Sequence, residues 1–100
     1  MVKHIILWTL KDGFSEAEKA EIKQNAKREL EALKGKIEGL TEIKLNINGL
    51  ASSNCDMMLD STLVDENALK AYQVNPYHQA AANSFVRPFT ETRLCLDFEI

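Results

Sequence analysis

One histidine stands where a protein could use it as a base. Asn75 followed by Pro76 is a strong signal for the start of a helix, since Asn caps helices well and Pro is favoured at the first helical position. His78 is then the third residue of that helix. The positive end of the helix dipole disfavours a protonated imidazole there, and a neutral imidazole can accept a proton. We therefore single out His78 as the candidate general base.

Tyr72 and Asp97 are the candidate partners of this base. The Tyr72 hydroxyl could donate a hydrogen bond to a substrate carbonyl or to a developing enolate. Asp97 is a lone acid in an otherwise apolar segment, and it could orient an imidazole. Each residue also has a structural interpretation: packing or capping for His78, a core aromatic beside Leu69 for Tyr72, and a surface position for Asp97. The candidate catalytic residues are His78, Tyr72 and Asp97.

Other chemistries have little support in the sequence. The two histidines, His4 and His78, and the two cysteines, Cys55 and Cys95, match no spacing typical of a metal site. The chain has no glycine-rich phosphate loop and no G-x-S-x-G segment. We predict neither a bound metal nor a cofactor.

Charge and hydropathy argue against two classes of partner. A net charge of −3 has the wrong sign for a protein held by phosphate neutralisation. The longest strongly apolar run, Ile5 to Trp8, is far shorter than the roughly 20 residues that span a bilayer. The run Ile5 to Leu10 is also shorter than a signal-peptide core, and no cleavage pattern follows it. We predict no nucleic acid, no membrane and a cytoplasmic protein in which both cysteines are reduced.

The order of expected elements indicates one domain over residues 1–100. Capping signals, turn residues and the periods of the apolar residues predict strands at 2–10, 40–47, 55–63 and 92–100, and helices at 15–34, 65–74 and 76–86. This β-α-β-β-α-β order predicts an α+β ferredoxin-like fold, in which a four-stranded antiparallel sheet carries its helices on one face.

The other face of such a sheet needs a cover. Alternation along the strands assigns to the helix side Ile43, Leu45, Ile47, Met57, Leu59, Leu63, Leu94, Leu96 and Phe98. It leaves on the outer face Lys44, Met58, Asp60, Cys95, Asp97 and one of the two alternate sets of the first strand. A second copy of the chain would close this mixed face. We predict a homodimer with a cavity between its sheets for a small apolar or aromatic molecule, lined by His4, Ile6, Trp8 and Met58.

The strand order also bears on the two cysteines. In the usual ferredoxin-like order the first strand lies between the strands that carry Cys55 and Cys95, which sets them about 9–10 Å apart. A disulfide needs Cα atoms within roughly 7 Å. We predict that the two cysteines are not bonded to each other within a chain.

Three blocks of the sequence resemble the stress-responsive A/B barrel domain (Dabb) family. They are residues 1–8 (MVKHIILW), 71–78 (AYQVNPYH) and 93–98 (RLCLDF). The resemblance covers essentially the whole chain and implies a dimeric α+β barrel. The family includes plant polyketide cyclases that use a His and a Tyr from the region matching Tyr72 and His78, although most members have no assigned reaction. Asn75 stands where many members have a His, and Glu38 where many have a Pro.

Three functional classes follow from these observations. The first is a homodimer that binds a small molecule and performs proton-transfer, cyclase-like chemistry with His78 and Tyr72. The second is a cofactor-free monooxygenase of the dimeric α+β barrel type, which Trp8 and an apolar cavity would permit. The third is a non-catalytic stress or assembly protein. Oxygen uptake distinguishes the second class, and a phenotype that survives loss of His78 would favour the third.

Overall fold

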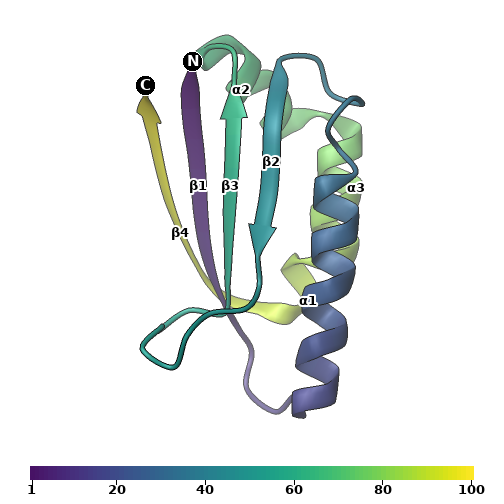
Figure 1. Ribbon diagram of the computed structural model, residues 1–100. Coiled ribbons are helices and arrows are strands. Elements are labelled where there is room, and N and C mark those ends of the chain that lie inside the picture. The colour runs from purple at the N-terminus through teal and green to yellow at the C-terminus, as the bar shows by residue number, and fades with distance from the viewer.

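The computed structural model describes all residues from Met1 to Ile100 and has two layers, a sheet and a set of helices on one of its faces (Figure 1). The strands pair antiparallel in the order β2-β3-β1-β4. The elements are β1 (Val2–Leu10), α1 (Glu16–Glu31), β2 (Leu40–Asn46), β3 (Met57–Leu63), α2 (Glu66–Val74), α3 (Pro76–Phe85), the 3-10 turn η1 (Arg87–Phe89) and β4 (Thr90–Glu99). The predicted ferredoxin-like fold and strand order are confirmed.

The start of each helix follows its sequence signal. Ser15 and Glu18 form a reciprocal capping box at α1. The Asp65 side chain accepts a hydrogen bond from the Ala68 amide at α2. Asn75 caps α3 by accepting from the Tyr77 amide at 2.9 Å. Because Asn75 is also the end of α2, it separates two consecutive helices, and this junction positions Tyr72 and His78.

The ends of the elements differ modestly from the prediction. The first helix ends at Glu31 rather than near Lys34, and a run of turns continues the chain to Gly39. The last strand begins at Thr90, directly after the η1 turn that contains Pro88. Only Val86 separates the end of α3 from η1, and β4 follows η1 directly.

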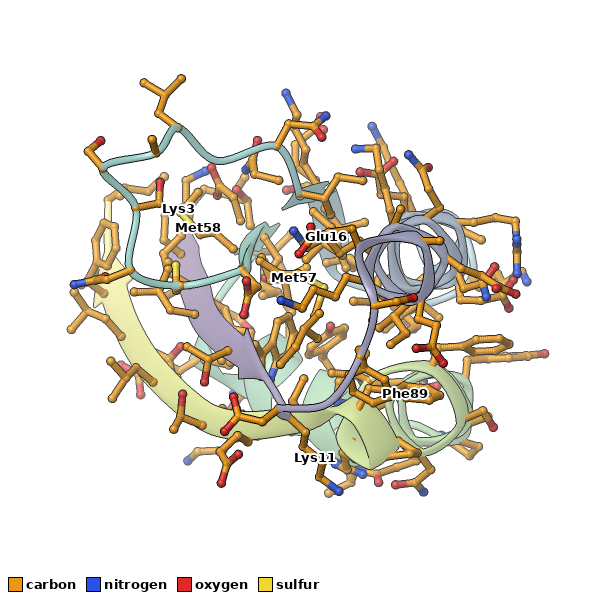
Figure 2. The ribbon with its side chains drawn as sticks, turned by 90° about the horizontal axis from the view of Figure 1, so that it is seen from below. Lys3, Lys11, Glu16, Met57, Met58 and Phe89 are labelled. Atoms are coloured by element: carbon orange, nitrogen blue, oxygen red, sulfur yellow. The ribbon has the colours of Figure 1, made fainter.

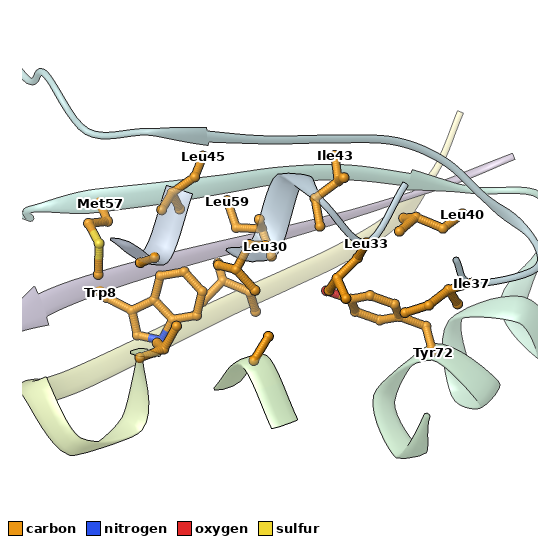
Figure 3. Close-up of a cluster of buried hydrophobic side chains, with 14 of the residues drawn as sticks. Trp8, Leu30, Leu33, Ile37, Leu40, Ile43, Leu45, Met57, Leu59 and Tyr72 are labelled. Atoms are coloured by element: carbon orange, nitrogen blue, oxygen red, sulfur yellow. The ribbon is translucent and has the colours of Figure 1, made fainter. Parts of the chain in front are cut away.

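The core lies between the sheet and the helices. The even-numbered residues of β1 face the helices and are buried, from Val2 to Leu10. They pack with apolar residues of α1, of β2 and β3, and of the helical layer, so that Trp8 lies close to Leu30 and Tyr72 close to Leu33 and Ile37 (Figure 3). This arrangement selects one of the two alternatives left open for the first strand.

The prediction for the faces of β4 was wrong. The register pairs Ile5 with Leu96 and His4 with Asp97, and directly opposed residues share a face of the sheet. Leu96 therefore lies on the outer face with Ile5, as do the residues two positions before and after it, Leu94 and Phe98. Cys95 and Asp97 lie on the helix side. On this side Arg93 lines a cavity and Asp97 contacts His4, and the side chains of this polar set are exposed rather than part of the apolar core.

The outer face is consequently more apolar than predicted. Met58 points to this side and Met57 to the helix side (Figure 2). Lys3 and Asp60 form an ion pair of 2.9 Å on the outer face. Around it are the exposed or half-buried apolar side chains Ile5, Leu7, Met58, Leu94, Leu96 and Phe98.

The two cysteines do not form a disulfide. Cys55 and Cys95 are free, and β1 separates β3 from β4, as predicted. Cys55 lies just before β3, which begins at Met57, rather than within the strand as predicted.

None of the helices combines the length and the apolar character that crossing a membrane requires.

Gly39 fixes the approach of α2 to the start of β2. Its φ is +85°, and a Cβ there would lie 2.6 Å from the Ala68 Cβ. Gly39→Ala is expected to lower the free energy of unfolding by about 2–4 kcal/mol, from left-handed strain plus overpacking. Urea denaturation measures it. The matched control is Gly35→Ala, because Gly35 has a similar φ of +86° but a Cβ added there would have no atom within 4 Å. Equal losses of unfolding free energy in the two variants would contradict a role for the Ala68 contact.

Candidate functional site

A cavity of about 250 Å³ lies between the helix side of the sheet and α3. Its wall combines six apolar side chains with Thr90 and four basic side chains. The apolar ones are Ile6, Trp8, Leu30, Leu59, Ala82 and Val86, and the basic ones are His4, His78, Arg87 and Arg93. The cavity belongs to a single chain. The predicted cavity between the sheets of two chains is therefore not needed to explain where these residues meet.

The predicted binding residues divide between the two faces of the sheet. His4, Ile6 and Trp8 line the cavity, since they are the inward-facing residues of β1. Met58 lies on the outer face and is not part of the cavity wall. Alternation within each strand does not show which set of β1 residues lies on the same side of the sheet as Met58 of β3, so the prediction placed all four together.

His78 and Tyr72 meet across the junction of α2 and α3. Their ring centroids are 4.3 Å apart, and the ring planes are inclined by 38°. Tyr72 is completely buried. Two buried side-chain polar atoms lack a hydrogen-bond partner within the chain, and they are the Tyr72 hydroxyl and His78 Nδ1. Buried polar atoms are normally paired, so these two need a partner from outside the chain, such as water, an ion or a ligand, or else are strained.

Asp97 contacts the other histidine. His4 and Asp97 are directly opposed in the β1–β4 register. A carboxylate oxygen can only accept, so His4 donates from Nδ1 to Asp97 Oδ1. The buried His4 ring in turn meets Tyr72 edge-on, at 5.9 Å between centroids and 70° between planes. Asp97 therefore contacts an imidazole, the role suggested for it from the sequence, but the imidazole is that of His4 rather than His78.

The four side chains form a continuous row from β4 to α3. It runs Asp97, His4, Tyr72, His78, through one hydrogen bond and two ring contacts. Asp97 and His4, at one end of the row, belong to the sheet, and Tyr72 and His78, at the other end, flank the junction of α2 and α3. The predicted catalytic residues are therefore brought together, with His4 as the link between Asp97 and the other two.

Burial keeps both ring groups of the α2–α3 junction uncharged. Burial, with smaller effects from the positive charges of Arg87, His4 and Arg93, lowers the pKa of His78 to about 4. His78 is therefore a neutral imidazole at physiological pH. Burial raises the pKa of Tyr72 well above its usual value, although the Arg93 charge opposes this. Tyr72 accordingly keeps its proton and can donate it in a hydrogen bond.

One group of side chains has the composition of a metal site. The donor atoms of His4, Cys95 and Asp97 lie within 4.8 Å of one another. Strand pairing creates this cluster, and spacing along the sequence gave no sign of it. However, His4 Nδ1 already donates to Asp97, and burial and the neighbouring Asp97 raise the pKa of the Cys95 thiol. Since metals bind the thiolate, these contacts favour a hydrogen-bonded cluster.

The two arginines of the cavity wall were not predicted from the sequence. Arg93 alternates with Cys95 and Asp97 along β4, so period-2 spacing places all three on one face. The signal was available once Asp97 was a candidate. Arg87 lies in the η1 turn after α3, and its side chain lines the cavity while it donates to Gln79 and Asn83 of α3. No local pattern predicts that position.

Comparison with known proteins supports this description of the fold. The chain is 30% identical to a dimeric protein of ferredoxin-like fold from Bacteroides fragilis, with a TM-score of 0.92 over 99% of this chain and 95% of that one. It is 25% identical to a dimeric ferredoxin-like protein from Thermobifida fusca, with a TM-score of 0.82 over 99% of this chain and 90% of that one. A cofactor-independent oxygenase from Streptomyces nogalater shares the fold at 15% identity, with a TM-score of 0.73 over 99% of this chain and 91% of that one.

Sequence-level comparison identifies the family. No curated protein sequence matches the chain. The family model for the stress responsive A/B barrel domain matches residues 2–100, which is nearly the entire chain. The Tyr72–His78 junction, the β1 strand and the β4 strand all lie inside the matched range. The chain belongs to the stress responsive A/B barrel domain (Dabb) family.

Proposed function

We propose that this chain binds a small carbonyl compound in the cavity between the sheet and α3. It would transfer a proton from a carbon next to the carbonyl. The observation that supports the proposal is the pair of polar atoms without a partner in the chain, the Tyr72 hydroxyl and His78 Nδ1. They belong to two rings in contact, and His78 lines the cavity. A buried polar atom left without a partner is costly, and a bound substrate would supply one.

The roles of the residues follow from their protonation. Neutral His78 lines the cavity and removes the proton from the carbon. The electron pair of the broken C–H bond moves to the carbonyl oxygen and gives an enolate. The Tyr72 O–H donates to that oxygen, and the Arg93 charge stabilises it further. His78 then returns its proton to the carbon. Alternatively the enolate carbon attacks a second carbonyl of the same molecule, as in an aldol-type cyclisation, and the alkoxide formed there takes the proton from His78.

Asp97 and His4 act as positioning residues in this scheme. Asp97 fixes the tautomer and orientation of His4 through Nδ1, and the edge of His4 holds the Tyr72 ring in place. Neither needs to touch the reacting carbon. Their hydrogen bond links the outer edge of the sheet to the row of rings that ends at His78.

Exchange of carbon-bound hydrogen for solvent deuterium tests the proposed reaction. The protein is incubated in deuterium oxide with benzylacetone or phenylpyruvate, which carry exchangeable hydrogens beside a ketone. Mass spectrometry of the recovered compound measures incorporation. We expect incorporation faster than in buffer with at least one of them, and dependent on His78. Incorporation equal to that in buffer for both compounds would contradict proton transfer as the activity.

We also propose that the outer face of the sheet joins two copies of the chain. Leu94 and Leu96 are 67% and 64% exposed, and with Phe98, Ile5, Leu7 and Met58 they form a broad apolar surface. Such a surface on a soluble chain marks an interface, and a stable one buries more than about 1,000 Å². The dimeric relatives from Bacteroides fragilis and Thermobifida fusca support this assembly.

Leu96→Lys is expected to convert the dimer into monomers, because it places a charge at the centre of the apolar surface and opposite Ile5. Light scattering coupled to size exclusion measures the mass. The control is Val74→Lys, which changes an apolar residue of α2 that is 75% exposed and away from the sheet. A wild-type mass equal to that of a single chain at all concentrations, or a dimer that survives Leu96→Lys, would contradict this interface.

A further inference from the structure

The cavity carries positive charge that no carboxylate balances. The chain has three arginines, and Arg28 pairs with Glu29 at 2.9 Å. The other two, Arg87 and Arg93, both line the cavity, and neither forms an ion pair. No Asp or Glu belongs to the cavity wall. In a chain with a net charge of −3, two unpaired arginines at one cavity are an unexpected concentration of positive charge.

Neutral groups hold Arg87 in position. Its Nη1 donates to Gln79 Oε1 at 3.0 Å and also to Asn83 Oδ1. Gln79 donates from its own amide to the Gln73 carbonyl, which ties the group to the end of α2. Amide oxygens orient the guanidinium but leave its charge in place. A guanidinium has five N–H donors, so Nη2 and Nε remain available to a ligand.

Arg93 approaches the same space from the sheet. It is directly opposite Trp8 in the β1–β4 register and on the helix side of β4. Its charge reaches both ring groups of the junction, since it lowers the pKa of His78 and opposes the rise in the pKa of Tyr72. Between the two arginines the wall is apolar, with Ile6, Leu59, Ala82 and Val86 beside Trp8.

We infer that the cavity binds a small carboxylate with an apolar body, held by Arg87 and Arg93 at its carboxylate and by Trp8 and Ile6 along its body. Guanidinium groups match the geometry of a carboxylate and pair with it through two parallel hydrogen bonds. A volume of about 250 Å³ with a mostly apolar wall suits a body of about one ring. The inference rests on the proposed function and names the class of its substrate.

Such a ligand would also change the base. The positive charges of Arg87 and Arg93 contribute to the low pKa of His78, after the larger effect of burial. A carboxylate bound between the arginines offsets these charges and raises the pKa of His78 toward neutrality, where a general base is most effective. Arrival of an anionic substrate therefore prepares His78 to accept the proton.

Trp8 provides a direct measurement of binding. It is the only tryptophan of the chain and lines the cavity, so its fluorescence responds to an occupant. The probes are cyclohexanecarboxylate and its uncharged analogue cyclohexanecarboxamide, which have the same body. We expect the carboxylate to bind about 10- to 100-fold more tightly, the range for one charge-assisted pair. Inorganic phosphate, which has charge but no apolar body, is expected to bind more weakly than the carboxylate.

Substitutions locate the source of this preference. Arg87→Gln and Arg93→Gln should each remove most of it, whereas Arg93→Lys should keep part of it, because a lysine retains the charge without the paired geometry. The matched control is Arg28→Gln, which removes an arginine of the α1 surface and should leave both affinities unchanged. Far-UV circular dichroism confirms that each variant is folded, and Arg87→Lys replaces Arg87→Gln if the latter unfolds.

Each result has a defined meaning. Equal affinity for the two probes, no binding of either, or a preference that survives both Gln variants overturns the carboxylate site. Phosphate that binds as tightly as the carboxylate shows that the occupant is a phosphate and that the carboxylate assignment is wrong. Arginine-dependent carboxylate binding without deuterium exchange supports the site and overturns the proton-transfer function. Deuterium exchange into benzylacetone, without tighter binding of the carboxylate probe, supports the proton-transfer function and overturns the carboxylate site.

Discussion

His78→Ala is expected to lower the rate of proton transfer by about 10²–10⁴-fold, the usual effect of removing a positioned general base. The physical reason is local. His78 lines the cavity, is neutral at physiological pH, and has a buried Nδ1 without a partner. No other neutral titratable side chain lines the cavity with an unpartnered buried atom, since His4 Nδ1 is engaged by Asp97. The deuterium-exchange rate measures the effect.

The dependence of the rate on pH provides a second measurement. The base is active when deprotonated, so with an uncharged substrate the wild-type rate is constant around neutral pH and falls as the pH drops through about 4. With an anionic substrate the fall is expected at a higher pH, because the bound charge raises the pKa of His78. A profile that is the same in wild type and His78→Ala would assign the titration to another group.

Stability should respond to the same titration. The pKa of His78 is 6.5 in ordinary surroundings and about 4 in the folded chain. Between these pH values the unfolded chain binds a proton that the folded chain does not, so the folded state loses stability as the pH falls from about 6.5 to about 4. His78→Ala removes this contribution to the slope. Urea denaturation at several pH values measures the difference.

The control for His78→Ala is Tyr77→Ala, which changes the preceding residue of α3. Tyr77 is 58% exposed and contacts Lys36 rather than the cavity. We expect full activity from it. Full activity in His78→Ala, or unfolding of that variant, would show that His78 has a structural role and that the catalytic assignment is wrong.

The local signals of the sequence were enough to predict the helix junction. Asn75 and Pro76 specify where α3 begins through capping and a fixed φ, and both effects depend on neighbouring residues only. The position of His78 in the first turn follows directly. The capping box at Ser15 and the alternation of β1 are local in the same sense, and the structure confirms them.

The faces of β4 could not be predicted in this way. Its two alternating sets are Leu94, Leu96 and Phe98 on one face, and Arg93, Cys95 and Asp97 on the other. The usual rule places the apolar set against the helices. That rule fails here because the register with β1 is a non-local property, and because a charged cavity and an apolar outer surface exchange the usual roles of the two faces.

The same limit applies to the row of side chains at the site. The hydrogen bond from His4 to Asp97 joins residues 93 positions apart, and the contact of His4 with Tyr72 needs the sheet and α2 to be in place. Residue type made His78, Tyr72 and Asp97 candidates. Only tertiary packing shows that Asp97 acts on His4, and that Arg87 completes the cavity.

Tyr72→Phe is expected to raise stability and lower activity together. The phenylalanine keeps the buried ring, whose centroid lies 4.3 Å from that of His78, but removes a hydroxyl that has no partner within the chain. An unpaired buried hydroxyl costs about 1–3 kcal/mol, so the free energy of unfolding should increase by about 1 kcal/mol. In the proposed function this cost is accepted because the hydroxyl donates to the enolate oxygen, which is the usual conflict between stability and activity at a functional site.

The exchange rate of Tyr72→Phe should fall by about 10- to 100-fold, the value of one hydrogen bond to a charged oxygen. This is a smaller loss than that of His78→Ala, since the base remains. Tyr77→Phe is the matched control, because it removes an exposed hydroxyl from the adjacent helix and should change neither quantity. Tyr72→Ala is unsuitable, since loss of the ring from the core would cost about 3–5 kcal/mol.

The combination of the two measurements separates function from packing. A hydroxyl that matters only for the fold would make Tyr72→Phe less stable, with activity lost in proportion to unfolding. A hydroxyl that matters for neither would leave the exchange rate unchanged while stability rises. Only a variant that is at least as stable as the wild type and slower at every temperature below its unfolding transition agrees with a Tyr72 O–H that donates to the enolate oxygen beside His78.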